Sequence, residues 1–376
     1  MLDPEKLDRI YSLGEITLIP KAKTYIKSRS EVNPFDENGK LPLFVAPMTC
    51  ILDVNNYDIF NQKSYAILPV YADSSYFIDA LELSNGWFAL TLDAFRTLTY
   101  STENTDYGNY FICIDTANGH MDELYDIVPT FKSKYPNSKV MIGNIANSNA
   151  YPYCCEAGID YVRVGIGGGN GCTTSVLTGE HNGIVNMLSE IQLLKLTRST
   201  TGSGEKFMTK VVADGGIDTI DKAIKCIALG ADYVMAGKMF AMCEESRGKK
   251  CYVRKEIDGF GEPYYDLFTN YDMTDEDYRA RCDIENIPYS RYRRAVEYYG
   301  QSSIEGQLDR FGKVKSEPEG CKVYLPVRYT YDRLCEQFEA ALRSAMSYND
   351  SWNLDTFRGY AQIKLQSIAE FNSYYK

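Results

Sequence analysis

The chain has 376 residues, of which 44% are hydrophobic and 24% are charged, and its net charge is −11. This composition is enough for a large core, whereas the acidic balance excludes a nucleic-acid partner, because binding a phosphate backbone needs a basic surface. No apolar run reaches membrane-spanning length and the polar N-terminus does not resemble a signal peptide, so we expect no membrane partner. The 11 cysteines form no CxxC motif, and we expect reduced thiols in a cytoplasmic protein.

Eight short apolar runs, rich in β-branched and aromatic residues, predict strands in the first two thirds of the chain. They are continuous rather than alternating, as is typical of buried parallel strands. With helical patterns between them, they predict an α/β fold: a (β/α)8 TIM barrel in a single domain (1–376), with a doubly wound sheet as the alternative. The predicted strands are 41–46, 65–71, 87–92, 110–114, 140–142, 161–164, 210–213 and 233–235, and the predicted helices are 121–134, 149–156, 184–196 and 219–229.

The later part of the chain departs from this rhythm. The polar stretch 198–205 is predicted to be a loop before the seventh strand. Residues from about 251 to 326 are charged, rich in tyrosine and predicted to be irregular, and an amphipathic helix resumes at 331–346. We interpret 251–326 as a flap-like insertion between the last strand and the last helix, on the active-site rim, because such long loops are usually functional. The tail 352–376 is a candidate for contact with a neighbouring subunit.

A glycine-rich stretch after the sixth predicted strand marks the candidate catalytic loop. Five glycines occur between residues 165 and 171, and glycine is favoured where backbone takes positive φ or approaches a ligand closely. Cys172 and Thr174 follow, which puts a thiol and a hydroxyl on a constrained turn, where a nucleophile is expected. A flexible loop with a chance cysteine is the simpler alternative. The glycine spacing differs from that of a dinucleotide fingerprint.

Two glycine turns at the ends of neighbouring predicted strands indicate a phosphate site. ADGGI ends the seventh strand and MAGK ends the eighth. In barrels these two turns commonly hold a phosphate through backbone N–H groups, here those of Gly216 and Gly237. Asp214 is placed to accept hydrogen bonds from ribose hydroxyls. Tight turns that simply need glycine are the alternative interpretation.

Polar residues also end the fourth and fifth predicted strands, at Asp115 and at Asn144. Active sites of barrels consist of such residues, although each also suits a helix cap or a turn. The two histidines, His120 and His181, lie in polar surroundings, and neither a metal-ligand spacing nor a Walker A sequence occurs.

Together these motifs resemble the family of inosine monophosphate (IMP) dehydrogenases and guanosine monophosphate (GMP) reductases. The resemblance covers most of the chain in the family's order, and it implies a TIM-barrel homotetramer acting on a purine mononucleotide. The chain has no room for the regulatory CBS modules that the dehydrogenases usually carry. The motifs that carry the resemblance are LPLFVAPMTCILD, FICIDTANGH, IGNIAN, VGIGGGNGCTT, ADGGI, ALGADYVMAGKMFA, YYGQSS, PEG and LRSAMSY.

The resemblance also implies roles for individual residues. Cys172, as thiolate, would attack C2 of the purine, and Thr174 and Glu319 would relay protons. It implies NADPH, or alternatively NAD, as cofactor, and K⁺ held by backbone of Gly167, Gly169 and Cys172. The substrate-binding residues would be Met48, Asn170, Asp214, Gly215, Gly216, Gly237, Lys238, Tyr298, Gly300, Gln301, Ser302 and Ser303, and the cofactor side would be Asp115, Thr116, Ala117, Asn144 and Arg163.

The sequence favours the reductase, which converts GMP and NADPH to IMP, ammonia and NADP. The motif ICIDTANG and the short segment between Arg310 and Glu319 resemble the reductases. Arg163, by contrast, is the dehydrogenase-like residue where reductases tend to have lysine, so IMP dehydrogenase is the first alternative.

Several departures from the family pattern leave other substrates open, such as a modified purine nucleotide. A flavin-dependent barrel oxidoreductase, whose cofactor would use the same two glycine turns, and a non-catalytic nucleotide-binding protein are further alternatives. The departures are Asn170, Gly171, Gln301 and Lys238.

Overall fold

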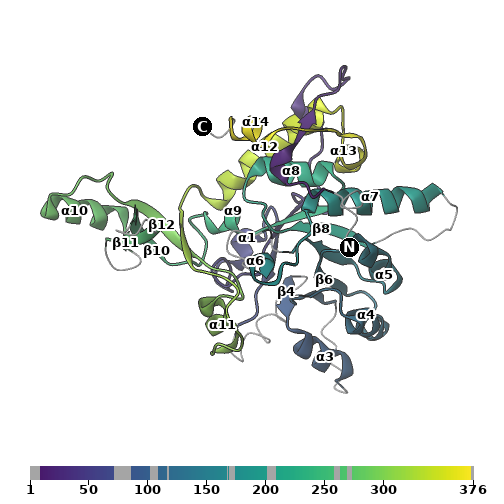
Figure 1. Cartoon of the computed structure of the whole chain (residues 1–376), viewed down its shortest axis with the longest axis horizontal. Helices are drawn as coiled ribbons and strands as arrows, with labels where there is room; N and C mark the ends of the chain where they lie inside the picture. The colour runs from purple at the N-terminus through teal and green to yellow at the C-terminus, as the bar shows by residue number, and fades with distance from the viewer. Residues whose placement is uncertain are drawn as a thin grey trace, which may run out of the picture.

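The computed structural model of the chain is built on a closed barrel of eight parallel strands (Figure 1). Each strand pairs with its neighbour in sequence, and the last pairs with the first, so the predicted TIM barrel is confirmed. The strands are β2 (Leu43–Val45), β3 (Tyr65–Leu68), β4 (Trp87–Leu90), β5 (Phe111–Ile114), β6 (Lys139–Ile145), β7 (Tyr161–Val164), β8 (Lys210–Asp214) and β9 (Tyr233–Ala236). The structure describes residues 9–71, 86–101, 109–116, 118–166, 168, 174–200, 209–257, 263–268 and 273–373.

Helices cover the outside of the barrel, and all the predicted ones are present. The largest difference in a boundary is at α7, which continues to Thr200. Residues 198–200 are therefore helical rather than loop, because no glycine or proline ends the pattern there, and residues 201–205 of the predicted loop lie outside the described residues. None of the described helices combines the length and apolarity that a bilayer crossing requires. The helices are α1 (Tyr57–Phe60), α3 (Leu92–Tyr100), α4 (Asp122–Lys134), α5 (Tyr151–Glu156), α6 (Thr174–Thr178), α7 (Ile184–Thr200), α8 (Ile220–Ala228), α9 (Lys238–Ala241) and α12 (Tyr331–Tyr348).

Aromatic side chains fill the amino-terminal end of the barrel. The ring of Phe44 lies 5.6 Å from that of Trp87 and 5.3 Å from that of Tyr233, both nearly edge to face, an arrangement worth about 1 kcal/mol per pair. The hydroxyls of Tyr65 and Tyr233 donate to Asp36, which covers this end. The floor is therefore closed, and the carboxyl end of the barrel is left for a site.

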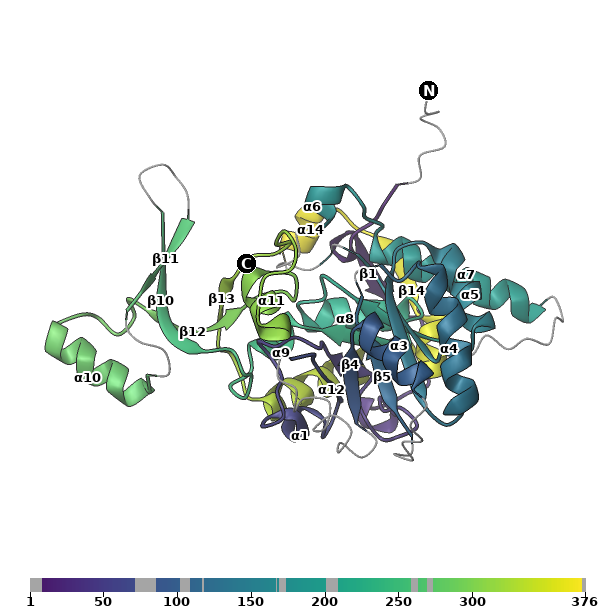
Figure 2. The same cartoon turned by 90° about the horizontal axis from the view of Figure 1, so that it is seen from below.

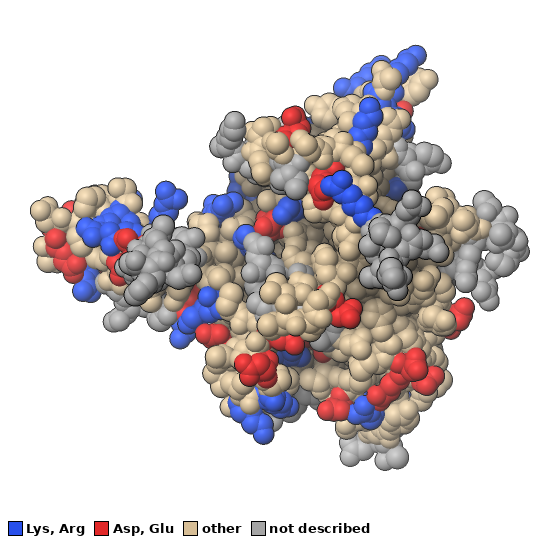
Figure 3. Space-filling model, in the orientation of Figure 1, with Lys and Arg blue, Asp and Glu red and all other residues tan. Residues whose placement is uncertain are grey.

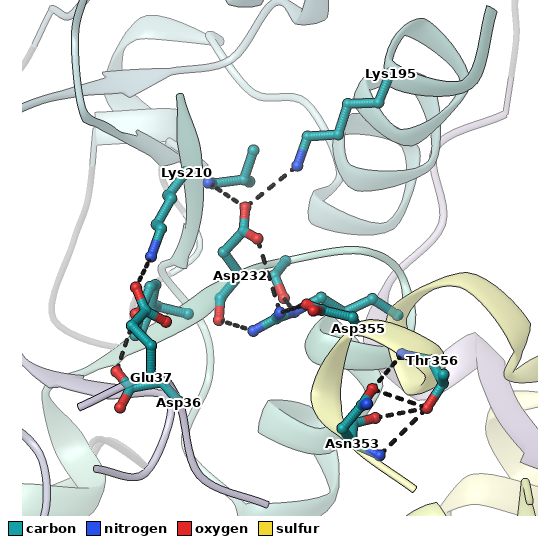
Figure 4. A network of polar contacts seen from close by, with 12 residues as sticks. Asp36, Glu37, Lys195, Lys210, Asp232, Asn353, Asp355 and Thr356 are labelled. Atoms are coloured by element: carbon teal, nitrogen blue, oxygen red, sulfur yellow. Dashed lines mark hydrogen bonds and ion pairs between the residues drawn. The ribbon is translucent and has the colours of Figure 1, made fainter. Parts of the chain in front are cut away.

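A repeated turn fixes the entry of two strands into this floor. Gly-Ile-Asp precedes β7 and Gly-Ala-Asp precedes β9, and a tyrosine begins each strand. In the second turn a carboxylate oxygen of Asp232 accepts hydrogen bonds from Val211 N (2.7 Å) and Lys195 Nζ (3.2 Å) (Figure 4). Asp160 does the same in the first turn, with Val140 N at 2.9 Å and Lys132 Nζ at 2.7 Å. Each aspartate thus ties its strand to the neighbouring strand and to a helix.

The insertion after β9 is regular, so the prediction of an irregular 251–326 is wrong. It forms a four-stranded antiparallel sheet in the order β11-β10-β12-β13, and β10, β11 and α10 project from the barrel as an arm (Figures 1 and 2). Tyrosines build its small core, in which the ring centroids of Tyr252 and Tyr278 are stacked 3.8 Å apart. Because tyrosine is less apolar than the usual core residues, the sequence of this sheet lacks the apolar runs that predict strands. The elements are β10 (Lys250–Ile257), β11 (Pro263–Leu267), α10 (Asp275–Glu285), β12 (Arg293–Tyr298), α11 (Ile304–Phe311) and β13 (Val323–Pro326).

The C-terminal tail folds back on its own chain. After α13 (Leu354–Tyr360), strand β14 (Gln362–Leu365) pairs antiparallel with β1 (Ile16–Ile19), and α14 (Ile368–Ser373) follows. Arg358 of α13 donates to the carbonyl oxygens of Ala231 (3.1 Å) and Asp232 (2.6 Å), so the tail is fastened to the turn before β9. On the face drawn in Figure 3, acidic and basic side chains are mixed, and the basic ones form no continuous surface there.

We predict that Asp232→Asn lowers the free energy of unfolding by about 1–3 kcal/mol, because a half-buried carboxylate with several donors is lost. Burial alone would raise the pKa of Asp232, but Lys195 and Arg358 lower it. A lowered folded-state pKa gives stability that is present above about pH 4 and is lost as the pH falls through the folded pKa. Urea denaturation across this range should therefore show a smaller acid loss in the variant.

The matched control is Asp355→Asn, which removes the exposed partner of the same Arg358 and should change stability little. Equal effects of the two substitutions would contradict the assignment of Asp232 as the anchor.

Candidate functional site

A cavity of about 220 Å³ opens at the carboxyl ends of the barrel strands. Its walls come from β2, β6, β7, β8 and β9, and the insertion contributes the side opposite them. The structure thus brings together most of the predicted substrate residues, which lie far apart in the sequence. The predicted residues that line it are Met48, Asn144, Asp214, Gly215, Gly216, Gly237, Lys238, Tyr298, Gly300, Gln301, Ser302 and Glu319.

The two glycine turns form a tight corner of this cavity. Gly216 has φ +72°, and a Cβ built on it would lie 2.5 Å from the carbonyl oxygen of Gly168. A Cβ on Gly237 would lie 2.8 Å from Met48 Sδ and 3.1 Å from Tyr298 Oη. Only glycine leaves the backbone open here, which is what an anion held by backbone N–H groups needs.

An aspartate that the sequence analysis missed stands in the same corner. Asp218 accepts from Lys238 Nζ at 3.2 Å and from Lys222 Nζ at 2.7 Å. Burial would raise the pKa of Asp218, but the two lysines lower it, so the carboxylate is ionised and holds Lys238 at the cavity wall. Two lysines and one aspartate therefore meet at this corner. The signal was the acidic residue directly after ADGGI.

Asp214 and Asn144 form a second polar contact in the cavity. Asn144 Nδ2 donates to Asp214 Oδ2 (2.9 Å) and to the carbonyl oxygen of Gly165 (2.7 Å). Burial raises the pKa of Asp214, and the charge of Arg163 opposes that effect. Asn144, predicted for the cofactor side, therefore lies beside the residue predicted to bind the ribose.

Asp115 lies in a buried ion cluster beside the cavity. Its two carboxylate oxygens face Arg163 (3.1 Å) and Arg310 of α11 (3.0 Å), and the three side chains are 14%, 5% and 11% exposed. Burial alone would raise the pKa of Asp115, but the two guanidinium groups lower it. Both arginine Nε atoms are buried and have no hydrogen-bond partner among the described residues. Arg310 was not among the predicted site residues.

Two predicted residues have structural tasks instead of facing the cavity. Ser303 is fully buried and caps α11, accepting from Gly306 N (3.1 Å) and donating to the carbonyl oxygen of Gly300 (2.8 Å). Thr116 Oγ1 bonds to the backbone of Asn118, within its own loop.

The candidate nucleophile and the K⁺ site lie outside the described residues. The backbone of Thr174 begins α6, but its side chain is outside them as well. The predicted site residues that lie wholly outside the described residues are Ala117, Gly167, Gly169, Asn170, Gly171 and Cys172.

Comparison with known proteins places this site in a family context. Residues 98–262 match the family described as IMP dehydrogenase / GMP reductase domain. An inosine-5′-monophosphate dehydrogenase of Chlorobaculum tepidum is 31% identical over 243 residues, which are 63% of this chain and 41% of that protein.

Two GMP reductases match over a greater length. Those of Streptococcus pneumoniae (strain JJA) and Oceanobacillus iheyensis are 28% and 26% identical, over 90% and 95% of this chain and 90% and 97% of their own length. The dehydrogenases of Chlorobaculum parvum, C. tepidum and Aquifex aeolicus, by contrast, are matched over less than half of their length.

We predict that Gly216→Ala destabilises the protein more than Gly39→Ala does. Both glycines have nearly the same positive φ, which costs alanine about 1–2 kcal/mol, but nothing lies within 4 Å of a Cβ on Gly39. The further loss at Gly216, about 1–3 kcal/mol from the clash with Gly168, isolates the contact between the two loops. Urea denaturation of both variants measures it, and equal losses would show that this contact is absent.

Proposed function

The chain belongs to the family of IMP dehydrogenases and GMP reductases, and on this premise we propose that it is a GMP reductase. The reaction converts GMP and NADPH to IMP, ammonia and NADP. The observation that carries the proposal is the match to GMP reductases over nine tenths or more of both chains, whereas the dehydrogenases are matched over less than half of their length. The cavity at the carboxyl end of the barrel, with the two glycine turns and Lys238 at one corner, supports it.

The barrel residues bind and orient the nucleotide in this proposal. Gly216 and Gly237 leave backbone open to the phosphate, and Lys238 adds a charge-assisted contact, for which Asp218 positions it. Asp214 accepts from the ribose hydroxyls, and Asn144 orients its carboxylate. These groups sit on different strand ends of one rigid barrel, so the base is held in a fixed orientation over the catalytic loop.

Cys172 performs the covalent step. Its thiolate sulfur bonds to C2 of the purine, and the bond from C2 to the exocyclic nitrogen breaks, so that ammonia leaves once that nitrogen has taken up a proton. Thr174 and Glu319 supply and return the protons near C2, since Glu319 lines the cavity from the insertion side. The covalent nucleotide splits one difficult displacement into two easier ones.

The cofactor side fits a group that brings hydrogen-bond acceptors. The Nε atoms of Arg163 and Arg310 are buried without a partner among the described residues, although Asp115 holds both guanidinium groups in place. These three residues would hold the nicotinamide. When bound, NADPH would supply the hydride that replaces the C2–sulfur bond. The K⁺ site and the homotetramer stay predictions.

IMP dehydrogenase is the second candidate. Dehydrogenases reach the higher identities, 29% and 31% against 28% and 26% for the reductases, and Arg163 is their typical residue. In that direction NAD accepts hydride from IMP, and water then releases xanthosine monophosphate from the same cysteine.

We predict that the purified protein consumes NADPH in the presence of GMP and releases ammonia in equal amount. The absorbance of reduced nicotinamide should fall, and it should not rise with IMP and NAD. The opposite pattern would assign the protein to the dehydrogenases, and a yellow protein with bound flavin would contradict both candidates.

We predict that Cys172→Ala lowers turnover by at least about a thousandfold, because the nucleophile is lost. Binding of GMP should be retained, since the phosphate and ribose contacts lie on other residues. Steady-state kinetics and calorimetric titration measure the two effects. Cys321→Ala, which removes an exposed cysteine outside the cavity, is the control and should keep full activity.

A further inference from the structure

Helix α11 carries one buried amide side chain that serves neither the helix nor the substrate. Gln307 is 2% exposed. Its Oε1 accepts from the backbone nitrogens of Lys315 (2.8 Å) and Ser316 (3.0 Å). Its Nε2 donates to the carbonyl oxygens of Ser316 (3.1 Å) and Ser302 (3.2 Å). The amide therefore has two accepted and two donated hydrogen bonds, which uses its full ordinary capacity.

These four hydrogen bonds join two parts of the cavity wall. Ser302 lies in the loop before α11 and lines the cavity. Its carbonyl oxygen also accepts from Glu319 N, at 3.0 Å. Gln307 therefore holds the exposed segment that leads to Glu319, while Glu319 itself is bonded to the same carbonyl group that Gln307 contacts.

The segment between α11 and Glu319 has few other attachments. Residues 312–317 are exposed, and among the described residues every hydrogen bond of Lys315 and Ser316 is made with Gln307. Removing such an anchor lowers the free energy at which an exposed segment opens. Gln307 thus restrains the chain at Lys315 and Ser316, a few residues before Glu319.

We propose that Gln307 is a positioning residue that holds Glu319 in the geometry needed for proton transfer. This inference rests on the role proposed above for Glu319. Proton transfer needs the carboxylate within hydrogen-bond reach of the reacting group, so a displacement of about 1 Å can cost about a hundredfold in rate. The phosphate and ribose contacts stand on barrel strands and are independent of Gln307.

The test is Gln307→Met, which keeps the length and helix propensity of the side chain and removes its hydrogen bonds. We expect kcat to fall between about tenfold and about a hundredfold, with the KM for GMP changed less than about threefold. Hydrogen exchange of the amides of Lys315, Ser316 and Glu319 should accelerate at least about tenfold. Leu308→Met, a change on the exposed side of the same helix, is the control and should alter neither quantity.

The two readouts separate the possible failures. Unchanged exchange in Gln307→Met would overturn the inference, and so would faster exchange with unchanged kcat. A rise in KM equal to the fall in kcat would also overturn it, because it would indicate general loss of the site. A third outcome is that exchange of these amides is faster in Gln307→Met than in the unsubstituted protein, while the unsubstituted protein turns over neither GMP nor IMP. The proposed function then fails, and the catalytic part of the inference fails with it.

Discussion

The site depends on the close approach of two loops, those after β7 and β8. A Cβ on Gly165 would lie 2.2 Å from the carbonyl oxygen of Asp214, and one on Gly216 would lie 2.5 Å from that of Gly168. Side chains at these glycines would force the loops apart. The approach brings the loop that continues to Cys172 to the corner proposed to hold the phosphate. The parallel pairing of β7 with β8 sets this spacing.

The barrel separates stability from chemistry along its axis. The aromatic floor, with Asp36 below it and the Asp160 and Asp232 turns beside it, occupies the amino-terminal end. The carboxyl end is polar, and buried charge there is balanced by specific partners, as Asp115 is by Arg163 and Arg310. Desolvation can exceed the Coulombic gain even for paired buried charges, so these residues are candidates for function rather than for stabilisation.

The barrel and its glycine turns were predictable because their signals are local. Strands buried on both faces are continuous apolar runs, and a turn that needs positive φ needs glycine, as at Gly216. The sheet of the insertion was not predictable, because its tyrosine core leaves a polar, charged pattern. Partners such as Asp218 with Lys238, Asp115 with Arg310, and Gln307 with Lys315 were equally hidden, since they depend on packing between elements rather than on sequence spacing.

The central claim is that the sulfur of Cys172 bonds to a purine nucleotide held at the two-loop corner. The most direct measurement is peptide mass spectrometry of the protein quenched in acid during turnover of GMP with NADPH. We expect the peptide containing Cys172 to carry the mass of the purine nucleotide without its amino group, and the other cysteine peptides to be unmodified. Turnover without such an adduct, or an adduct on another cysteine, would contradict the account.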